Sequence, residues 1–216
     1  MKKILIFGSG EREEKSFYNK FLNEENILIV AVDGGANSLF ELGRIPDILI
    51  GDNDSIRKEV LEKLRNSHTK IFNYPSEKNY SDFELASDYI INNEERSDIL
   101  LFNMFGERID QFLFNLEVCK KLTKACFNVS MIRSNCEIYF LKDNSILEIK
   151  GKIGDTVSIL PAKEAVNILK TVGLKYELIN EKLYNETTRG LSNELIKDSC
   201  RIEISEGMAI IVFLRK

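Results

Sequence analysis

Residues 46–56 read PDILIGDNDSI, and this stretch decides which fold and which chemistry the sequence predicts. An apolar run ends at Ile50 and is followed by a glycine and then by Asp52 and Asp54, which are separated by one residue. Such a run is typical of a strand that is buried on both faces of a parallel sheet. Residues two apart in an extended chain point to the same side, so the two carboxylates would repel each other unless a positive charge lies between them.

Similar apolar runs alternate with helical periods through the first two thirds of the chain. The expected strands are KILIF (3–7), ILIVAV (27–32), DILIG (47–51), KIFNY (70–74), DILLFNM (98–104) and NVSMI (128–132). The expected helices include residues 55–66 with Ser55 as N-cap, residues 81–90 with a capping box of Ser81 and Glu84, and residues 110–122. Strands that alternate with helices predict right-handed crossovers, and therefore an α/β domain with a Rossmann-like, mostly parallel sheet covered by helices on both faces.

The pattern changes after about residue 135, where short strands are broken by turns and no long helical period appears. The expected strands are CEIYFLK (136–142), SILEIKG (145–151), DTVSILPA (155–162), VNILKTV (166–172), KYELI (175–179) and residues 199–216. They predict a second domain, a C-terminal antiparallel β-sandwich. We place the domains at residues 1–138 and 139–216.

Composition narrows the class of protein. Lys and Arg number 30 against 34 Asp and Glu, a formal net charge of -4, which argues against a nucleic-acid partner. The four cysteines form no C-x-x-C pair and the chain has one histidine, so a zinc site is not expected. No apolar segment approaches the roughly 20 residues that span a bilayer, and the opening MKKILIFGSG does not resemble a signal peptide. We expect a cytoplasmic enzyme or binding protein without a membrane partner.

Polar and glycine-containing segments follow the expected parallel strands. They are GSG (8–10), DGGAN (33–37), GDNDS (51–55), YPSEKNYSD (74–82) and MFGERIDQ (104–111). The carboxyl ends of parallel strands meet at one edge of the sheet, and this edge holds the ligand crevice in open α/β folds. Glycines allow backbone to approach a phosphate, and helix N-termini favour anions. A turn at the end of a strand explains GSG nearly as well as a contact with the nucleotide.

Four aspartates at this edge, Asp33, Asp52, Asp54 and Asp82, predict a cation site. At about 6 Å and an effective dielectric near 20, each charged pair would repel by roughly 3 kcal/mol. A divalent cation would relieve that repulsion, and carboxylate oxygens are ligands that suit Mg²⁺. Each segment taken alone is also explained as a solvated turn or a helix cap. From the residues themselves, the prediction is a magnesium-dependent α/β protein that handles phosphates.

Four segments together resemble the thiamine pyrophosphokinase family. They are VDGGANSLFELGRIPDILIGDNDSI (32–56), YPSEKNYSDFELA (74–86), FGERIDQFLFNL (105–116) and NETTRGLSNEL (185–195). The resemblance covers nearly the whole chain, with both domains in the expected order. It implies an N-terminal domain that binds ATP and Mg²⁺, a C-terminal sandwich that binds thiamine, and a homodimer with the thiamine site between subunits. The implied reaction converts ATP and thiamine into AMP and thiamine diphosphate.

The resemblance also implies roles for individual residues. The implied catalytic and metal-binding residues are Asp52, Asp54, Asp82 and Asp110. The implied contacts with ATP and its phosphates are Asp33, Gly34, Asn37, Lys78 and Arg108. The implied thiamine contacts are Thr188, Arg189, Gly190, Ser192 and Asn193. One aspartate would accept the proton of the thiamine hydroxyl, and the sequence does not say which one.

The sequence departs from the family pattern at three positions. Glu107 stands in place of a glycine, Gln111 in place of a histidine and Asn79 in place of an aspartate. These changes put in doubt a proton-transfer role at Gln111 and metal ligation at Asn79, and they motivate a second hypothesis, a nucleotide or thiamine sensor without turnover. A third hypothesis is a transferase or phosphatase that uses D-x-D on another substrate, but it leaves RGLSN unexplained.

Overall fold

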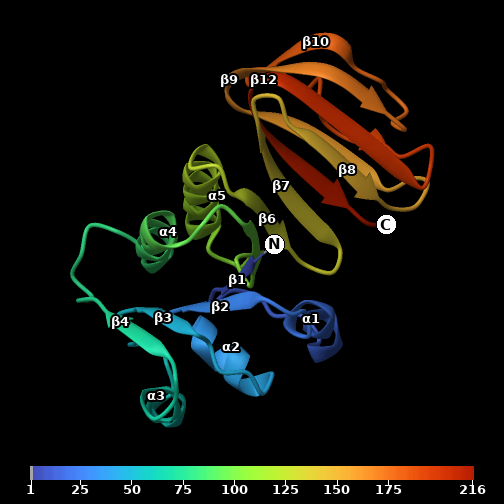
Figure 1. Cartoon of the computed structure of the whole chain (residues 1–216). Helices are drawn as coiled ribbons and strands as arrows, with labels where there is room; N and C mark the ends of the chain where they lie inside the picture. The colour runs from blue at the N-terminus through green and yellow to red at the C-terminus, as the bar shows by residue number, and fades with distance from the viewer. Residues whose placement is uncertain (1) are drawn as a thin grey trace. The chain divides into compact units, whose positions relative to one another are not determined.

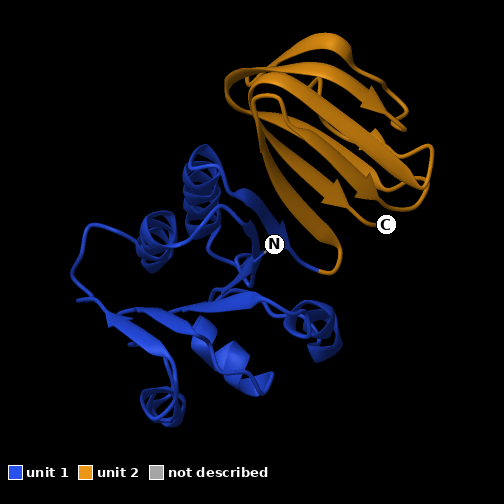
Figure 2. Cartoon of the chain, in the orientation of Figure 1, with its two compact units in different colours: residues 1–133 blue, residues 134–216 orange. Residues whose placement is uncertain are grey.

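The computed structural model describes residues 2–216, and the chain divides into two compact units, with the boundary between Arg133 and Ser134 (Figure 2). The sequence placed this boundary at 138/139, which lies inside strand β7 (Cys136–Lys142). All of β7 belongs to the second unit because it pairs along its whole length with β12 (Ser199–Leu214).

The first unit is an α/β domain whose sheet is parallel, as predicted. Its strands are β1 (Lys3–Phe7), β2 (Ile27–Val32), β3 (Ile48–Gly51), β4 (Lys70–Asn73), β5 (Asp98–Phe102) and β6 (Asn128–Ile132). Their order across the sheet is β6-β5-β1-β2-β3-β4, and every neighbouring pair is parallel. The chain therefore reverses its direction of winding beside β1, the kind of position at which α/β sheets open a crevice.

Helices cover both faces of this sheet (Figure 1). They are α1 (Lys15–Leu22), α2 (Gly35–Glu41), α3 (Lys58–Arg65), α4 (Asp82–Asn93) and α5 (Ile109–Lys124). Leu5 and Phe7 of β1 pack in one apolar cluster with residues of α1, α2 and α3. Because side chains alternate along a strand, the equally buried Ile4 and Ile6 point to the opposite face, where α4 and α5 lie (Figure 1). Within residues 2–216, no helix is both long and apolar enough to cross a bilayer.

The two predicted N-caps have different outcomes. Ser81 caps α4 as predicted, because its hydroxyl accepts a hydrogen bond from the Glu84 N–H at 3.1 Å. Ser55 does not cap α3, so that prediction was wrong. The helix begins at Lys58 after Arg57, and the Ser55 hydroxyl instead donates to a carboxylate oxygen of Asp33.

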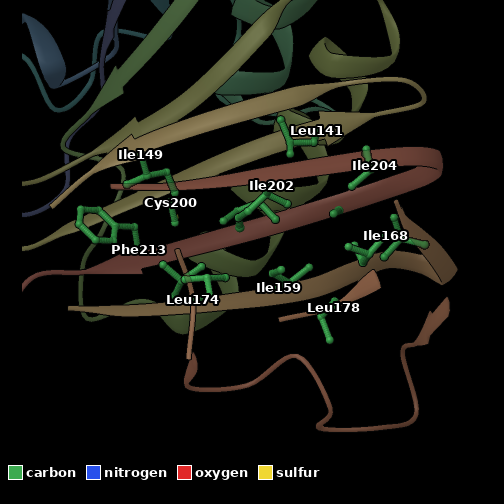
Figure 3. Packing of buried hydrophobic residues seen from close by; sticks show 14 of the residues in the cluster. Leu141, Ile149, Ile159, Ile168, Leu174, Leu178, Cys200, Ile202, Ile204 and Phe213 are labelled. Carbon is green, nitrogen blue, oxygen red and sulfur yellow. The ribbon is translucent and has the colours of Figure 1, made fainter. Parts of the chain in front are cut away.

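The second unit is antiparallel throughout and encloses its own apolar core (Figure 3). Its other strands are β8 (Ile146–Lys150), β9 (Thr156–Val172), β10 (Ile179–Tyr184) and β11 (Asn193–Glu194). The first part of β12 pairs with β8 and the last part with β7, while β9 follows β12 along most of its length through several register shifts. Register shifts of this kind bend a strand, so that one strand can belong to both sheets of a sandwich.

Two predictions about the strands of this unit were wrong in detail. The segments 155–162 and 166–172 form one strand, β9, because its bulges replace a turn. Residues 175–178 are not a strand, and β10 begins at Ile179. The apolar signal in that region comes from Leu174 and Leu178, which are buried although they lie in a loop.

Candidate active site

A cavity of about 800 Å³ lies in the first unit, lined by the loops that follow β1, β2, β4 and β5. This volume is within the range of sites that bind small molecules. Five residues proposed from the sequence line it: Asp33, Lys78, Asp82, Arg108 and Asp110. The loops all leave the carboxyl ends of parallel strands, so the cavity forms at the edge of the sheet that the sequence indicated.

Three aspartates from different loops converge at this edge. Asp33 follows β2, Asp52 follows β3 and Asp82 is the first residue of α4. One carboxylate oxygen from each lies within 4.8 Å of the others. Asp54, the fourth aspartate expected here, lies outside this group, and its side chain is exposed to solvent.

The environments of these carboxylates differ. Asp33 has a backbone φ of 46°, and its Oδ2 accepts the hydrogen bond from Ser55, whereas its Oδ1 is buried and has no hydrogen-bond partner within residues 2–216. Burial raises the pKa of Asp82, although the Lys78 ammonium acts in the opposite direction. The negative charge of Asp52 raises the pKa of Asp54. The cluster therefore carries charge that is only partly compensated, which is the property expected of a cation site.

Lys78 supplies the positive charge next to the cluster. Its ammonium nitrogen lies 3.3 Å from Asp52 Oδ2 and 3.1 Å from Asp82 Oδ1. The Asp52 pKa is lowered, first because its carboxylate accepts the Asp54 N–H at 3.2 Å and further because of Lys78. The structure thus places Lys78 against the acids themselves.

Arg108 and Asp110 form a separate pair at the start of α5. The guanidinium donates from Nε to Oδ1 at 3.0 Å and from an Nη to Oδ2 at 2.5 Å, and this fork lowers the pKa of Asp110 to about 2. Both side chains are largely exposed, and Asp110 is not part of the group formed by the other acids. Glu107 and Gln111 line the same cavity.

Two residues expected to contact ATP have structural partners. Asn37 is buried, and its amide donates to the Ser55 carbonyl at 2.9 Å and accepts from the Arg57 N–H at 3.0 Å. A Cβ at Gly34 would lie 2.7 Å from Ser55 Oγ, so a larger residue there would force this hydroxyl to shift. Asn37 therefore holds the loop that carries Asp52 and Ser55, and Gly34 leaves room for it.

The GSG segment is explained by the packing of the backbone. The Gly8 and Gly10 N–H groups donate to the carbonyls of Phe102 and Asn103, at 3.0 and 2.7 Å. A Cβ at Gly10 would lie 2.0 Å from the Phe105 carbonyl oxygen. These two N–H groups are therefore used within the protein, and the turn at the end of β1 is the better explanation of this segment.

The segment assigned to thiamine lies in the second unit, after β10 and up to Asn193, the first residue of β11. Asn193 is buried and hydrogen-bonds to the backbone of Tyr176. Gly190 packs so closely that a Cβ there would lie 2.1 Å from the Ile159 carbonyl oxygen. These two residues shape the turn.

The other three residues of this segment are exposed. Thr188 and Ser192 present their side chains to solvent, and Ser192 has a backbone φ of 57°. Arg189 forms a fork with Glu181, with Nε donating at 2.7 Å and an Nη donating at 3.1 Å. These side chains are exposed and can therefore meet a ligand.

Sequence reasoning missed several residues around the cavity. The rings of Phe105 and Phe112 stack with centroids 5.4 Å apart, and both line the cavity. Asn103, which also lines it, is buried and accepts a hydrogen bond from the Tyr18 hydroxyl at 2.6 Å. Its Nδ2 has no partner in the described part of the chain. Asn103 and Phe105 follow β5 directly, and this position was the available signal, whereas Phe112 lies within α5.

Comparisons with known proteins agree across both units. Residues 18–131 match the family model described as "Thiamin pyrophosphokinase, catalytic domain", and residues 143–209 match "Thiamin pyrophosphokinase, vitamin B1 binding domain". Thiamine pyrophosphokinase of Bacillus subtilis (strain 168) is 28% identical over 190 residues, which cover 88% of each chain.

Solved structures share the fold. The crystal structure of the Bacillus subtilis thiamine pyrophosphokinase superposes with a TM-score of 0.85 at 24% identity, over 100% of both chains. The thiamin pyrophosphokinase of Geobacillus thermodenitrificans superposes with a TM-score of 0.81 at 26% identity, over 99% of this chain and 98% of that one. The chain belongs to the thiamin pyrophosphokinase family.

Proposed function

We propose that this chain transfers the pyrophosphoryl group of ATP to the hydroxyl of thiamine, which yields thiamine diphosphate and AMP. The hydroxyl oxygen attacks the β-phosphorus, the bond from that phosphorus to the oxygen bridging the α-phosphate breaks, and the hydroxyl proton passes to a base. The observation that carries the proposal is the group of Asp33, Asp52 and Asp82 beside a cavity of about 800 Å³, in a chain whose two units match the two family models.

The acid cluster fits Mg²⁺. It offers hard oxygen ligands, and the buried Asp33 Oδ1 without a partner is an oxygen that a cation would satisfy. We assign metal binding to Asp33, Asp52 and Asp82, and we keep Asp54 and Asp110 as further acidic groups of the site. When bound, the metal would neutralise negative charge on the phosphates of ATP.

Basic side chains supply the other part of phosphate recognition. Arg108 presents a planar fork that suits phosphate oxygens, and it is exposed at the cavity. Lys78 lies beside Asp52 and Asp82, the acids that would bind the metal, and therefore close to the phosphates that this metal would contact. We assign both residues to the stabilisation of charge on the transferred group.

We assign thiamine to the turn of the second unit. Thr188, Arg189 and Ser192 would contact it through their exposed side chains, while Gly190 and Asn193 hold the turn in shape. The family models support this assignment, because residues 143–209 match the vitamin B1 binding domain.

We also propose a homodimer in the cytoplasm, with the thiamine site between subunits. Many large apolar side chains of the second unit are exposed, among them Ile153, Ile179 and Leu191, and a second copy of the chain would cover such a surface. The buried thiols Cys119 and Cys200 suit a reducing compartment. Analytical ultracentrifugation tests the dimer, and a monomer at micromolar concentration would contradict it.

One assay separates this proposal from its rivals. The purified protein is incubated with ATP, Mg²⁺ and thiamine, and the nucleotide and thiamine products are resolved by chromatography. We expect AMP and thiamine diphosphate in equal amounts. ADP or phosphate in their place would indicate another transferase or a phosphatase, and binding of both substrates without products would indicate a sensor.

A further inference from the structure

Lys78 is held by three oxygen atoms. Its ammonium nitrogen lies 3.3 Å from Asp52 Oδ2 and 3.1 Å from Asp82 Oδ1, and it donates to the Pro75 carbonyl at 3.1 Å. The Lys78 side chain is 13% exposed. The contacts with Asp52 and Pro75 are hydrogen bonds, whereas the contact with Asp82 is an ion pair, and Asp82 Oδ1 has no hydrogen-bond partner within residues 2–216.

The same two carboxylates belong to the group that would hold a divalent cation. Asp33, Asp52 and Asp82 each offer that group one oxygen, and Lys78 contacts two of the three residues. A metal ion bound to Asp52 and Asp82 would lie within a few ångströms of the ammonium and repel it. The two cations therefore cannot both bind these carboxylates at full strength.

The chain gives Lys78 room to move. It lies in the loop between β4 and α4, outside regular structure, and a lysine carries its charge on a flexible stem. Lys78 also lines the cavity that we assign to the phosphates. An ammonium released from the acids would therefore remain next to the phosphate groups.

We propose that Lys78 is an exchangeable counter-ion of Asp52 and Asp82, which a divalent cation displaces toward the phosphate site. The inference rests on the proposed function, because it takes this cluster as the metal site. Lys78 then does two opposed things: it weakens metal binding in the absence of nucleotide, and it contributes positive charge to the transferred group once the metal is bound.

Binding of Mn²⁺ without nucleotide tests the competition. Free Mn²⁺ is measured by electron paramagnetic resonance for the wild type, Lys78→Met, Lys78→Gln and Lys78→Arg. The methionine removes the charge, the glutamine removes it but keeps a donor for Pro75, and the arginine keeps it. We expect both neutral variants to bind Mn²⁺ roughly tenfold more tightly or better, and Lys78→Arg to stay within about twofold of wild type.

A matched control is available in α4 and α5. Lys121 also contacts two carboxylates, Glu84 at 3.2 Å and Asp88 at 2.7 Å, but it does not touch the acid cluster. Lys121→Met should leave Mn²⁺ affinity unchanged. Thermal unfolding in EDTA provides a second readout: Lys78→Met should melt below wild type because the acids lose their counter-ion, and Mn²⁺ should raise its melting temperature by more than it raises that of wild type.

Several results would overturn the proposal. Unchanged or weaker Mn²⁺ binding by both neutral variants, in an enzyme that still forms thiamine diphosphate, would reject the competition and leave the proposed function standing. Equal tightening in Lys121→Met would show a general charge effect. If even the wild type does not bind Mn²⁺, the metal site and the inference that depends on it both fail.

Discussion

Asn193 holds Tyr176 with both ends of its side-chain amide. The nitrogen donates to the Tyr176 carbonyl at 2.7 Å, and the oxygen accepts from the Tyr176 N–H at 3.0 Å. The same oxygen also accepts from the Glu194 N–H at 3.0 Å. Asn193 is 7% exposed, so these bonds are largely shielded from water. Asn193 therefore joins the turn assigned to thiamine to a loop of the same unit.

Asn193→Ala should lower stability as well as activity. Loss of the side chain leaves backbone donors and an acceptor of Tyr176 and Glu194 unpaired in a buried place, which should reduce the free energy of unfolding by about 2–3 kcal/mol. Urea denaturation measures this loss. Ser192→Ala is the comparison, because Ser192 is exposed: it should raise the KM for thiamine while changing stability by less than about 0.5 kcal/mol. A normal urea midpoint in Asn193→Ala would contradict the structural role.

Asp54→Asn should reduce AMP formation by about 100-fold or more. The field of Asp52 and Asp33 already raises the pKa of Asp54, so its carboxylate interacts with the cluster although it points to solvent. Steady-state kinetics measure the effect, and circular dichroism should show an unchanged fold. Asp88→Asn is the control, because Asp88 pairs with Lys121 away from the cluster. Activity of Asp54→Asn near the wild-type level would remove Asp54 from the site.

Arg108→Ala should lower kcat/KM for ATP by roughly 100-fold, while Arg108→Lys should recover part of the loss. Lysine keeps the charge, but it cannot form the fork that Arg108 now makes with Asp110. Melting temperatures should not change, because both side chains are exposed. Arg201→Ala, which removes an exposed arginine paired with Glu203, should leave the kinetics unaffected. Equal activity in the alanine and lysine variants would show that charge at this position is irrelevant.

Asp155 should make the second unit sensitive to acid. Its carboxylate is buried and accepts the N–H groups of Lys152 at 2.7 Å and Lys216 at 3.0 Å. Burial by itself raises the pKa, but these donors hold it below the ordinary value of 3.8. Because the folded state binds the proton less tightly, the stabilisation is present above pH 3.8 and is lost as the pH falls through the lower folded pKa.

Asp155→Asn tests this dependence. At pH 7 the variant should lose about 1–3 kcal/mol of unfolding free energy, and the difference from wild type should shrink as the pH falls below 3.8. Urea denaturation at several pH values measures both quantities. Asp143→Asn is the comparison, because Asp143 is exposed and accepts one N–H, from Gly207 at 2.6 Å. A difference that grows toward low pH would show that the sign of the shift is wrong.

Patterns among neighbouring residues correctly predicted the strands and helix starts that depend only on those neighbours. Unbroken apolar runs predicted the parallel strands of the first unit, and Ser81 as N-cap predicted the start of α4. Ser55 failed as a cap because a distant carboxylate, Asp33, takes its hydroxyl. The long strand β9 was divided into two, since a bulge and a turn have similar local sequences.

The sequence by itself determined that acidic residues follow several buried strands, and that those strands belong to a parallel sheet whose carboxyl ends meet at one edge. Strand alternation and helical period depend on near neighbours, so they can be deduced without coordinates. Only the tertiary structure decided which acids meet. It joined Asp82 to Asp33 and Asp52, set Lys78 between two of them, and turned Asp110 toward Arg108. These contacts depend on how loops that are distant in the sequence pack against each other. They also depend on which charged groups become buried, because a buried charge requires an opposite charge or a hydrogen-bond partner.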